Sequence, residues 1–142
     1  MKKLFFIFLI IIFTNNAYAS NWLLLNTSSK ENGAIANGKT YIDTDSIKKI
    51  GGYVYAWGMI DLDETTDNFS SGGFSVLSVK FYDQIQCDIG RVKRLNYTFY
   101  NGNYGTGRNI TDVPKDPEWS YVAPGTIEET IKNFACKNYM DD

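Results

Sequence analysis

The two cysteines, Cys87 and Cys136, constrain the fold of this chain more than any other feature. Cys136 ends a segment that has the pattern of a helix. A Pro-Gly break at residues 124–125 precedes Thr126 and Glu129, whose spacing is that of a capping box, so a helix is predicted to begin here. Four apolar residues then recur at helical spacing: Ile127, Ile131, Phe134 and Ala135. We therefore predict a strand-rich body with one C-terminal helix tied to it through the cysteines.

The N-terminal residues 1–19 have the pattern of a secretory signal peptide. Lys2 and Lys3 form a basic start, residues 4–13 are apolar, and Ala-Tyr-Ala at residues 17–19 supplies a cleavage site. The apolar run is too short to span a bilayer, which takes roughly 20 residues. A buried N-terminal strand or a membrane anchor is the alternative. We expect one domain at residues 20–142. We expect no lipid attachment at the mature N-terminus, because no cysteine directly follows the apolar run at the predicted cleavage site.

Two cysteines in an exported chain are expected to form one disulfide, here between Cys87 and Cys136. The alternative is a catalytic thiol, which needs a base as its partner. The sequence contains no histidine, so the Cys-His and Ser-His mechanisms of hydrolases are excluded. A structural disulfide is the favoured interpretation.

The charge balance argues against nucleic acid as a partner. The full chain has 14 basic and 16 acidic residues, a net charge of −2. Loss of Lys2 and Lys3 with the signal peptide changes this to 12 − 16 = −4. An acidic chain is a poor general binder of nucleic acid. We also expect no transmembrane segment in the mature chain, so any partner is met through a local patch.

Alternation of apolar and polar residues predicts about six strands, and with the helix an α+β fold. The predicted strands are residues 22–25, 39–43, 53–60, 74–83, 85–100 and 119–122. A single helical turn is expected at residues 45–49. Residues 85–100 are interpreted as one long or bulged strand that follows a turn near Gln84 and carries Cys87 early.

Strand 53–60 is predicted to be central and covered on both faces, because neither face carries a charge. Its face with Ala56 and Gly58 leaves room for the helix to pack. On an ideal helix Cys136 points about 180° away from Ile127. Either the helix frays before Cys136 or the disulfide leaves from its flank, and fraying is the interpretation we favour.

No motif predicts a metal, a cofactor or a catalytic residue. Four acidic residues at 61–67 (Asp61, Asp63, Glu64 and Asp67) lack the Gly and Glu positions of a calcium loop, so a solvated hairpin loop is favoured. Gly102, Gly105 and Gly107 precede no Gly-Lys-Ser/Thr and no helix, which favours a turn between strands. A pair of carboxylates for glycoside cleavage stays open, since nothing singles out two acids.

One basic cluster stands out. Arg91, Lys93 and Arg94 lie near Lys80 of the preceding strand and are followed by Tyr97. Basic side chains with aromatic neighbours on a sheet face can bind an acidic protein segment or a glycan. The alternative is a solvated strand face without a ligand.

Four segments, by their order and spacing, resemble the bacterial surface-adhesin E family: Tyr-Ile-Asp-Thr-Asp-Ser-Ile at residues 41–47, the segment around Cys87, residues 99–107, and residues 124–139. The resemblance implies a six-stranded antiparallel sheet with a C-terminal helix packed on a face and tied by a disulfide. It also implies binding of host proteins, notably vitronectin and laminin, and dimerisation. Carried over, the vitronectin-binding region is roughly residues 75–97, with Lys80, Arg91, Lys93 and Arg94 as its basic residues.

Two departures from the family pattern bear on function. Strand 74–82 holds only Lys80, where the family's adhesin is much more basic. That adhesin is a lipoprotein, whereas the predicted cleavage site here has no lipidation cysteine. We therefore expect an exported, non-enzymatic binding module located in the periplasm, at the cell surface or in the medium. A periplasmic protein of envelope or inhibitory function, without a host ligand, is the alternative.

Overall fold

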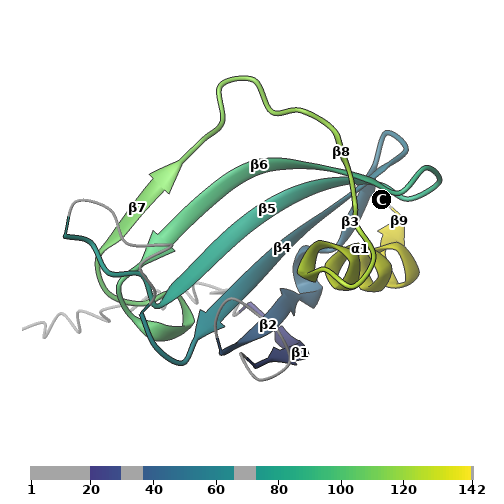
Figure 1. The fold of residues 1–142 in the computed structure, drawn as a ribbon. Coiled ribbons are helices and arrows are strands. Elements are labelled where there is room, and N and C mark those ends of the chain that lie inside the picture. The colour runs from purple at the N-terminus through teal and green to yellow at the C-terminus, as the bar shows by residue number, and fades with distance from the viewer. Residues whose placement is uncertain (1–19, 30–36, 66–72, 142) are drawn as a thin grey trace, which may run out of the picture.

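The computed structural model describes residues 20–29, 37–65 and 73–141 (Figure 1). The predicted signal peptide, residues 1–19, lies outside these ranges. Within them, no helix is long and apolar enough to cross a membrane.

In the described ranges the fold is one twisted sheet with one α-helix, as predicted (Figure 1). Six strands follow one another across it, each antiparallel to its neighbours: β1 (Trp22–Ser28), β2 (Gly38–Asp43), β4 (Tyr53–Leu62), β5 (Ser78–Gln86), β6 (Arg91–Tyr100) and β7 (Asn109–Asp112). Three short strands lie off this path: β3 (Lys48–Ile50) beside β4, β8 (Ser120–Tyr121) beside β6, and β9 (Met140–Asp141) parallel to β3. Two 3₁₀ turns, Thr44–Ser46 and Asn103–Gly105, complete the described elements.

The helix α1 (Ile127–Asn138) begins at the predicted cap. The Thr126 hydroxyl accepts a hydrogen bond from the Glu129 backbone N–H at 3.2 Å, and the Glu129 carboxylate accepts one from the Gly125 N–H at 2.7 Å. The second bond reaches one residue further back than the usual capping box. Both bonds satisfy donors at the helix start that would otherwise have no partner.

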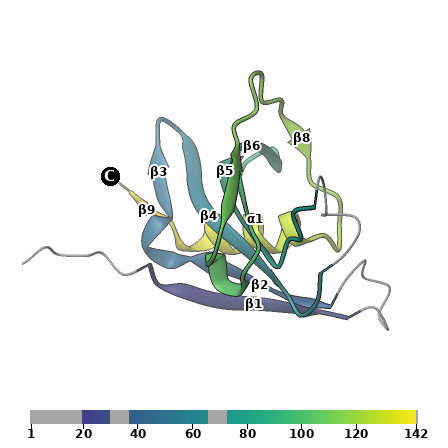
Figure 2. The same cartoon turned by 90° about the vertical axis from the view of Figure 1, so that its left-hand side faces the viewer.

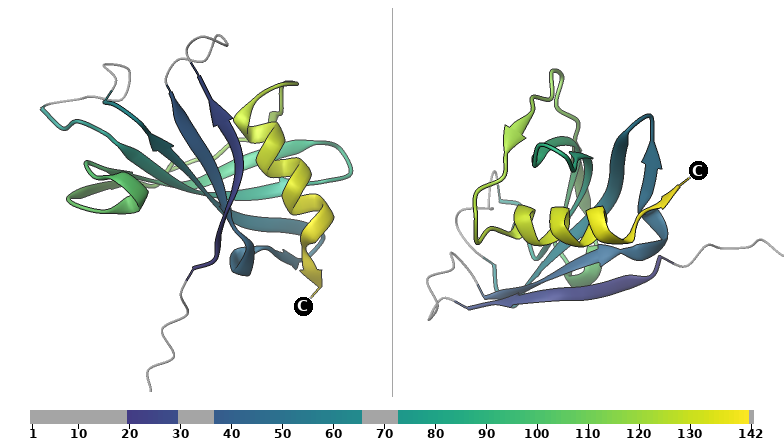
Figure 3. Two further views of the ribbon diagram at one scale, coloured as in Figure 1. Left: turned by 90° about the horizontal axis from the view of Figure 1, so that it is seen from below. Right: turned by 90° about the vertical axis from the view of Figure 1, so that its right-hand side faces the viewer.

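The sheet curves around α1, with β1 and β2 on one side of the helix and β8 on the other (Figures 2 and 3). Ile131 and Ala135 are buried in one cluster with Val54 and Ala56 of β4, which confirms that the helix packs on the Ala56 face. Gly58 leaves room for the Phe81 ring instead, since a Cβ at this position would overlap that ring.

The expectation that both faces of β4 are covered is wrong. Val54 and Ala56 are buried, whereas Tyr53, Tyr55 and Trp57 on the other face are only half-buried. Large aromatic side chains with polar ends tolerate such partial exposure. Residues 53–57 of β4 therefore present an uncharged and partly accessible surface on this face.

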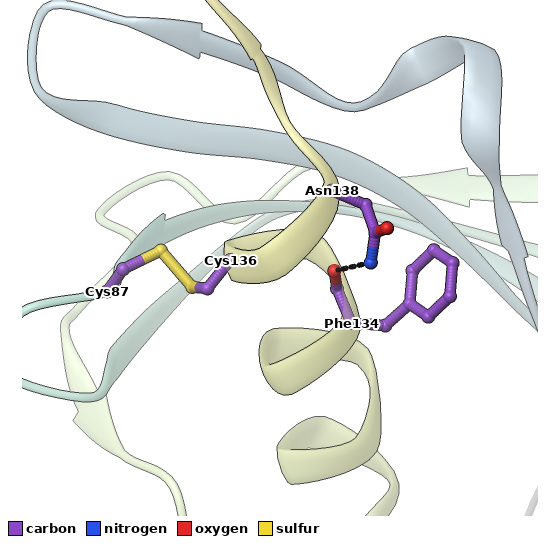
Figure 4. The surroundings of a disulfide bond; sticks show 4 residues. All are labelled: Cys87, Phe134, Cys136 and Asn138. Carbon is purple, nitrogen blue, oxygen red and sulfur yellow. Dashed lines mark hydrogen bonds between the residues drawn. A yellow bond between two sulfur atoms is a disulfide. The ribbon is translucent and has the colours of Figure 1, made fainter.

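The disulfide between Cys87 and Cys136 is present, with the two Cα atoms 5.8 Å apart (Figure 4). The expectation that the helix frays before Cys136 is wrong, because α1 continues to Asn138. The Asn138 side-chain amide donates to the Phe134 carbonyl at 2.8 Å and closes the last turn. Cys136 follows the buried Ala135, so the disulfide leaves from the flank of the helix.

The interpretation of residues 85–100 as one long or bulged strand is wrong at its start, because β6 begins only at Arg91, although the register of β6 against β5 does shift at Leu95. Ile85 is fully buried and belongs to β5, and the chain turns at residues 87–90, three residues after the predicted position. The Gly90 N–H donates to the Gln86 carbonyl at 2.9 Å, and the φ of Gly90 is +70°, which glycine adopts without strain. Cys87 therefore sits in a hairpin turn, from which its sulfur reaches α1.

Candidate functional site

The face of the sheet turned away from α1 carries aromatic and basic side chains, and we call it the aromatic face. Residues directly opposite one another on antiparallel strands point to the same side. The register pairs Tyr55 with Gln84 and Trp57 with Tyr82. On the next strand it pairs Gln84 with Lys93. The half-buried members of this face used below are Tyr53, Tyr55, Trp57, Tyr82, Gln84, Arg91 and Lys93.

The rings of the aromatic face contact one another. Trp57 and Tyr82 stack with their ring centroids 4.9 Å apart, and Tyr55 lies 6.0 Å from Tyr82. The Tyr55 hydroxyl accepts a hydrogen bond from the Gln84 amide at 2.8 Å. Burial raises the pKa of Tyr82, and the neighbouring Tyr55 adds to the shift. Tyr82 therefore stays neutral at physiological pH and keeps a hydroxyl that can donate or accept.

Two cations of the aromatic face share the Trp119 ring. The Lys93 ammonium lies 4.7 Å from the ring centroid and the Arg91 guanidinium carbon 5.4 Å from it. Tyr53 stacks on the same indole at 5.4 Å. Cation–π contacts hold a charged group in place without neutralising it. Trp119 thus positions both charges next to each other.

Neither of these cations has a carboxylate partner in the described part of the chain, where the salt bridges formed are those of Arg94. The Arg91 guanidinium donates to the Gln86 side-chain carbonyl at 2.7 Å. Its Nε is buried and has no hydrogen-bond partner among the described residues. Two adjacent, uncompensated positive charges favour an anion at this position.

Lys80 lies on the same face but not in the same cluster. It is aligned with Thr98, whereas Lys93 is aligned with Gln84. Lys80 and Gln84 are four residues apart on β5, so Lys80 lies roughly 13 Å along the strand from the position of Lys93. The Lys80 ammonium lies 5.4 Å from the ring centroids of both Trp22 and Tyr100.

The predicted single patch is wrong in its geometry, because Arg94 and Tyr97 lie on the opposite face. Lys93 and Arg94 are consecutive and point to opposite sides of β6. An irregularity at Leu95 then shifts the register, so that Arg94 pairs with Asp83 and Tyr97 with Phe81, both on the α1 side. Whether Arg94 and Tyr97 contact a ligand stays a prediction.

Arg94 is engaged in an ion pair inside the fold. Its guanidinium donates from Nε and Nη2 to the two carboxylate oxygens of Asp83, and Glu128 of α1 lies 4.0 Å away. The Asp83 side chain is 1% exposed and that of Arg94 17%. Burial raises the pKa of Asp83, although Arg94 opposes the shift. Desolvation lowers the pKa of Arg94, but Asp83 outweighs it and the pKa of Arg94 is raised, so the guanidinium stays charged.

A pocket of about 280 Å³ lies beside this ion pair, between β6 and the chain that leads into α1. Arg94, Tyr97 and Glu128 line it together with Ser120 and Thr126. The predicted site residues are therefore divided. Arg91, Lys93 and Lys80 belong to the aromatic face, and the other two belong to this pocket.

Two contributors were missed by sequence reasoning. The predicted strand 119–122 does not place Trp119 beside Arg91. The predicted helical turn at residues 45–49 is wrong for Lys48, because the 3₁₀ turn spans Thr44–Ser46 and Lys48 belongs to β3. Lys48 lies on β3 opposite Tyr55 and so joins the aromatic face. Alternation along residues 119–122 could have placed Trp119 and Tyr121 on one face. Their pairing with β6 is long-range, however, and no local pattern reveals it.

Of the acidic residues at 61–67, Asp61 lies on β4 and has a structural role. The Asp61 carboxylate is buried and accepts hydrogen bonds from the Tyr104 N–H at 2.6 Å and the Asn103 amide at 3.3 Å. It thereby holds the Asn103–Gly105 turn against β4. Among the described residues no group of acidic, cysteine or histidine side chains is arranged to hold a metal. Asp67 lies outside the described ranges.

Comparison with known proteins gives a consistent result. The family model of surface-adhesin protein E matches residues 22–137. A crystal structure of Haemophilus influenzae protein E (crystal form II) is similar with a TM-score of 0.54 and 22% identity, covering 70% of this chain and 81% of that one. The structure of protein E from non-typeable H. influenzae has a TM-score of 0.54 and 18% identity, covering 85% of this chain and 87% of that one. No curated protein is similar enough to match.

Proposed function

The chain belongs to the surface-adhesin protein E family, and from this premise we propose that it is an exported, non-enzymatic adhesin that binds host extracellular proteins through the aromatic face. Membership of a family of surface adhesins implies export. The proposal includes cleavage of residues 1–19, leaving residues 20–142 as one domain without lipid. Vitronectin and laminin are the proposed ligands.

The observation that carries the proposal is the pair Arg91 and Lys93, held against Trp119 without a carboxylate partner in the described chain. Ordered cations lose little side-chain freedom on binding, which favours recognition of an acidic surface. Lys80 supplies a further charge on the same face. The pocket lined by Arg94 and Tyr97 is kept as the alternative contact region, in place of the aromatic face.

We expect the double variant Arg91→Ala/Lys93→Ala to bind vitronectin or laminin about tenfold more weakly, because two charge contacts at a partly exposed surface are each worth roughly 0.2–1 kcal/mol. Its affinity should also depend less on salt, since fewer charges are screened. Surface plasmon resonance over a range of salt concentrations measures both effects. Unchanged binding by this variant would move the site away from the aromatic face.

Location separates the adhesin from its alternative, a periplasmic protein of envelope or inhibitory function. We expect antibody to label intact cells, and protease to remove the label, while a periplasmic control protein stays protected. A signal that appears only after permeabilisation, with none in the medium, would contradict host binding.

Dimerisation stays a prediction. The edge strand β1 exposes Leu23 and Leu24, and this surface is one that a second copy could cover.

A further inference from the structure

A row of side chains crosses four strands of the aromatic face and has a cation at each end. Lys48 of β3 lies opposite Tyr55 of β4, Tyr55 opposite Gln84 of β5, and Gln84 opposite Lys93 of β6. Three strand spacings separate the two ends, or about 14 Å. The middle of the row is polar and ordered, because the Gln84 amide donates to the Tyr55 hydroxyl.

The surroundings of this row carry no exposed carboxylate at the strand positions that share its face on β3, β4, β5 and β6. The acid among them, Asp61, is buried and holds the Asn103–Gly105 turn. Four cations occupy the same set of positions: Lys48, Lys80, Arg91 and Lys93. The face is therefore locally positive, although the chain as a whole is acidic.

We infer that this row binds an extended anionic glycan, such as a sulphated polysaccharide, which crosses the strands from the Arg91/Lys93/Trp119 cluster toward Lys48. The inference deepens the proposed function and rests on it for export and for the choice of face. It names the chemical class of the ligand: a chain with hydroxyl groups and repeated sulphate or carboxylate groups.

The cluster supplies the strongest contact for an anionic group. Lys93 and Arg91 are both held on the Trp119 indole, and neither has a carboxylate partner in the described part of the chain. A sulphate or carboxylate beside them would accept charge-assisted hydrogen bonds. Lys48, exposed at the far end of the row, would meet a second anionic group of the same chain.

The rest of the row suits a sugar chain better than a peptide. β4 and β5 are paired on both sides, so their backbone groups cannot add a strand from a peptide ligand. Recognition must then come from side chains that stand off the sheet. The Gln84 amide and the phenols of Tyr55 and Tyr82 can bond to hydroxyl groups, and the half-exposed rings offer apolar surface to the C–H groups of a sugar.

The test measures binding of heparin oligosaccharides to the purified mature protein by isothermal titration calorimetry. Arg91→Gln/Lys93→Gln is expected to lower the affinity for a heparin octasaccharide about tenfold. Lys48→Gln should lower it about threefold while leaving binding of a heparin disaccharide unchanged, because the disaccharide is too short to reach both ends. The matched control Lys132→Gln/Lys137→Gln removes the same charge from α1 and should change the affinity less than about twofold.

Several results would overturn the inference. The first is that the wild type does not bind heparin. The second is that the α1 control loses as much affinity for heparin as the Arg91→Gln/Lys93→Gln variant. The third is that single-stranded DNA or a proline-rich peptide binds more tightly than heparin through the same residues. Binding of vitronectin or laminin without binding of heparin would overturn the inference and leave the proposed function standing. Binding of heparin without binding of either host protein would overturn the proposed function and leave the inference standing. Circular dichroism of each variant checks that the fold is kept.

Discussion

Replacing both Cys87 and Cys136 with serine is expected to lower the free energy of unfolding by about 4 kcal/mol. The disulfide closes a loop with a sequence separation of 49 residues, and in the chain-entropy model it stabilises the fold by restricting the unfolded chain. Folded domains have a net stability of only ~5–15 kcal/mol, so a loss of this size is a large share of the total.

The effect should be greatest at α1. The helix has 12 residues and buries only Ile131 and Ala135 completely. A helix of this length is marginal on its own and depends on docking against β4. Without the link from Cys136 to the hairpin turn at Cys87, hydrogen exchange should show α1 opening before the central strands.

Denaturant unfolding followed by tryptophan fluorescence measures the loss. Wild type in reductant should unfold like the double serine variant, and the variant should not respond to reductant. A change of less than about 1 kcal/mol would contradict the entropic account and imply that the reduced chain stays compact when unfolded.

Local sequence signals predicted much of this fold because they act over a few residues. The Thr126 cap, the helical spacing that ends near Ala135, and the six-strand alternation each depend on neighbours in the chain. The disulfide followed from the count of cysteines and the expected export. The turn after β5 is predicted too early because the charged Asp83 interrupts the apolar alternation, whereas in the structure Asp83 and Ile85 are both buried and β5 continues to Gln86.

The candidate site was harder to predict because one irregularity decides it. Alternation places Lys93 and Arg94 on opposite faces, but only the shift at Leu95 brings Tyr97 to the same side as Arg94. No local sequence signal marks Leu95 as the site of a register shift. The pairing of β8 with β6, which brings Trp119 to Arg91 and Lys93, depends on contacts between distant parts of the chain.

Asp83→Ala is expected to destabilise the fold by about 3–5 kcal/mol, because it leaves the Arg94 guanidinium without its main partner in a buried position. Glu128 lies 4.0 Å from Arg94 and is half exposed, so it offsets only part of the loss. The double variant Asp83→Leu/Arg94→Met should be more stable than Asp83→Ala, since apolar side chains of similar size remove the uncompensated charge. Denaturant unfolding of wild type, single and double variants measures these differences.

The same variants decide what Arg94 contributes to binding. Arg94 faces α1 with Asp83, whereas Arg91 and Lys93 face away from it, so a stable Asp83→Leu/Arg94→Met protein should bind vitronectin or heparin as the wild type does. Loss of binding by the Arg91→Ala/Lys93→Ala protein at unchanged stability would then assign the ligand to the aromatic face. If the stable Asp83→Leu/Arg94→Met protein instead lost binding, the pocket lined by Arg94 and Tyr97 would be the contact region. Arg94 would then act on the ligand as well as on the fold.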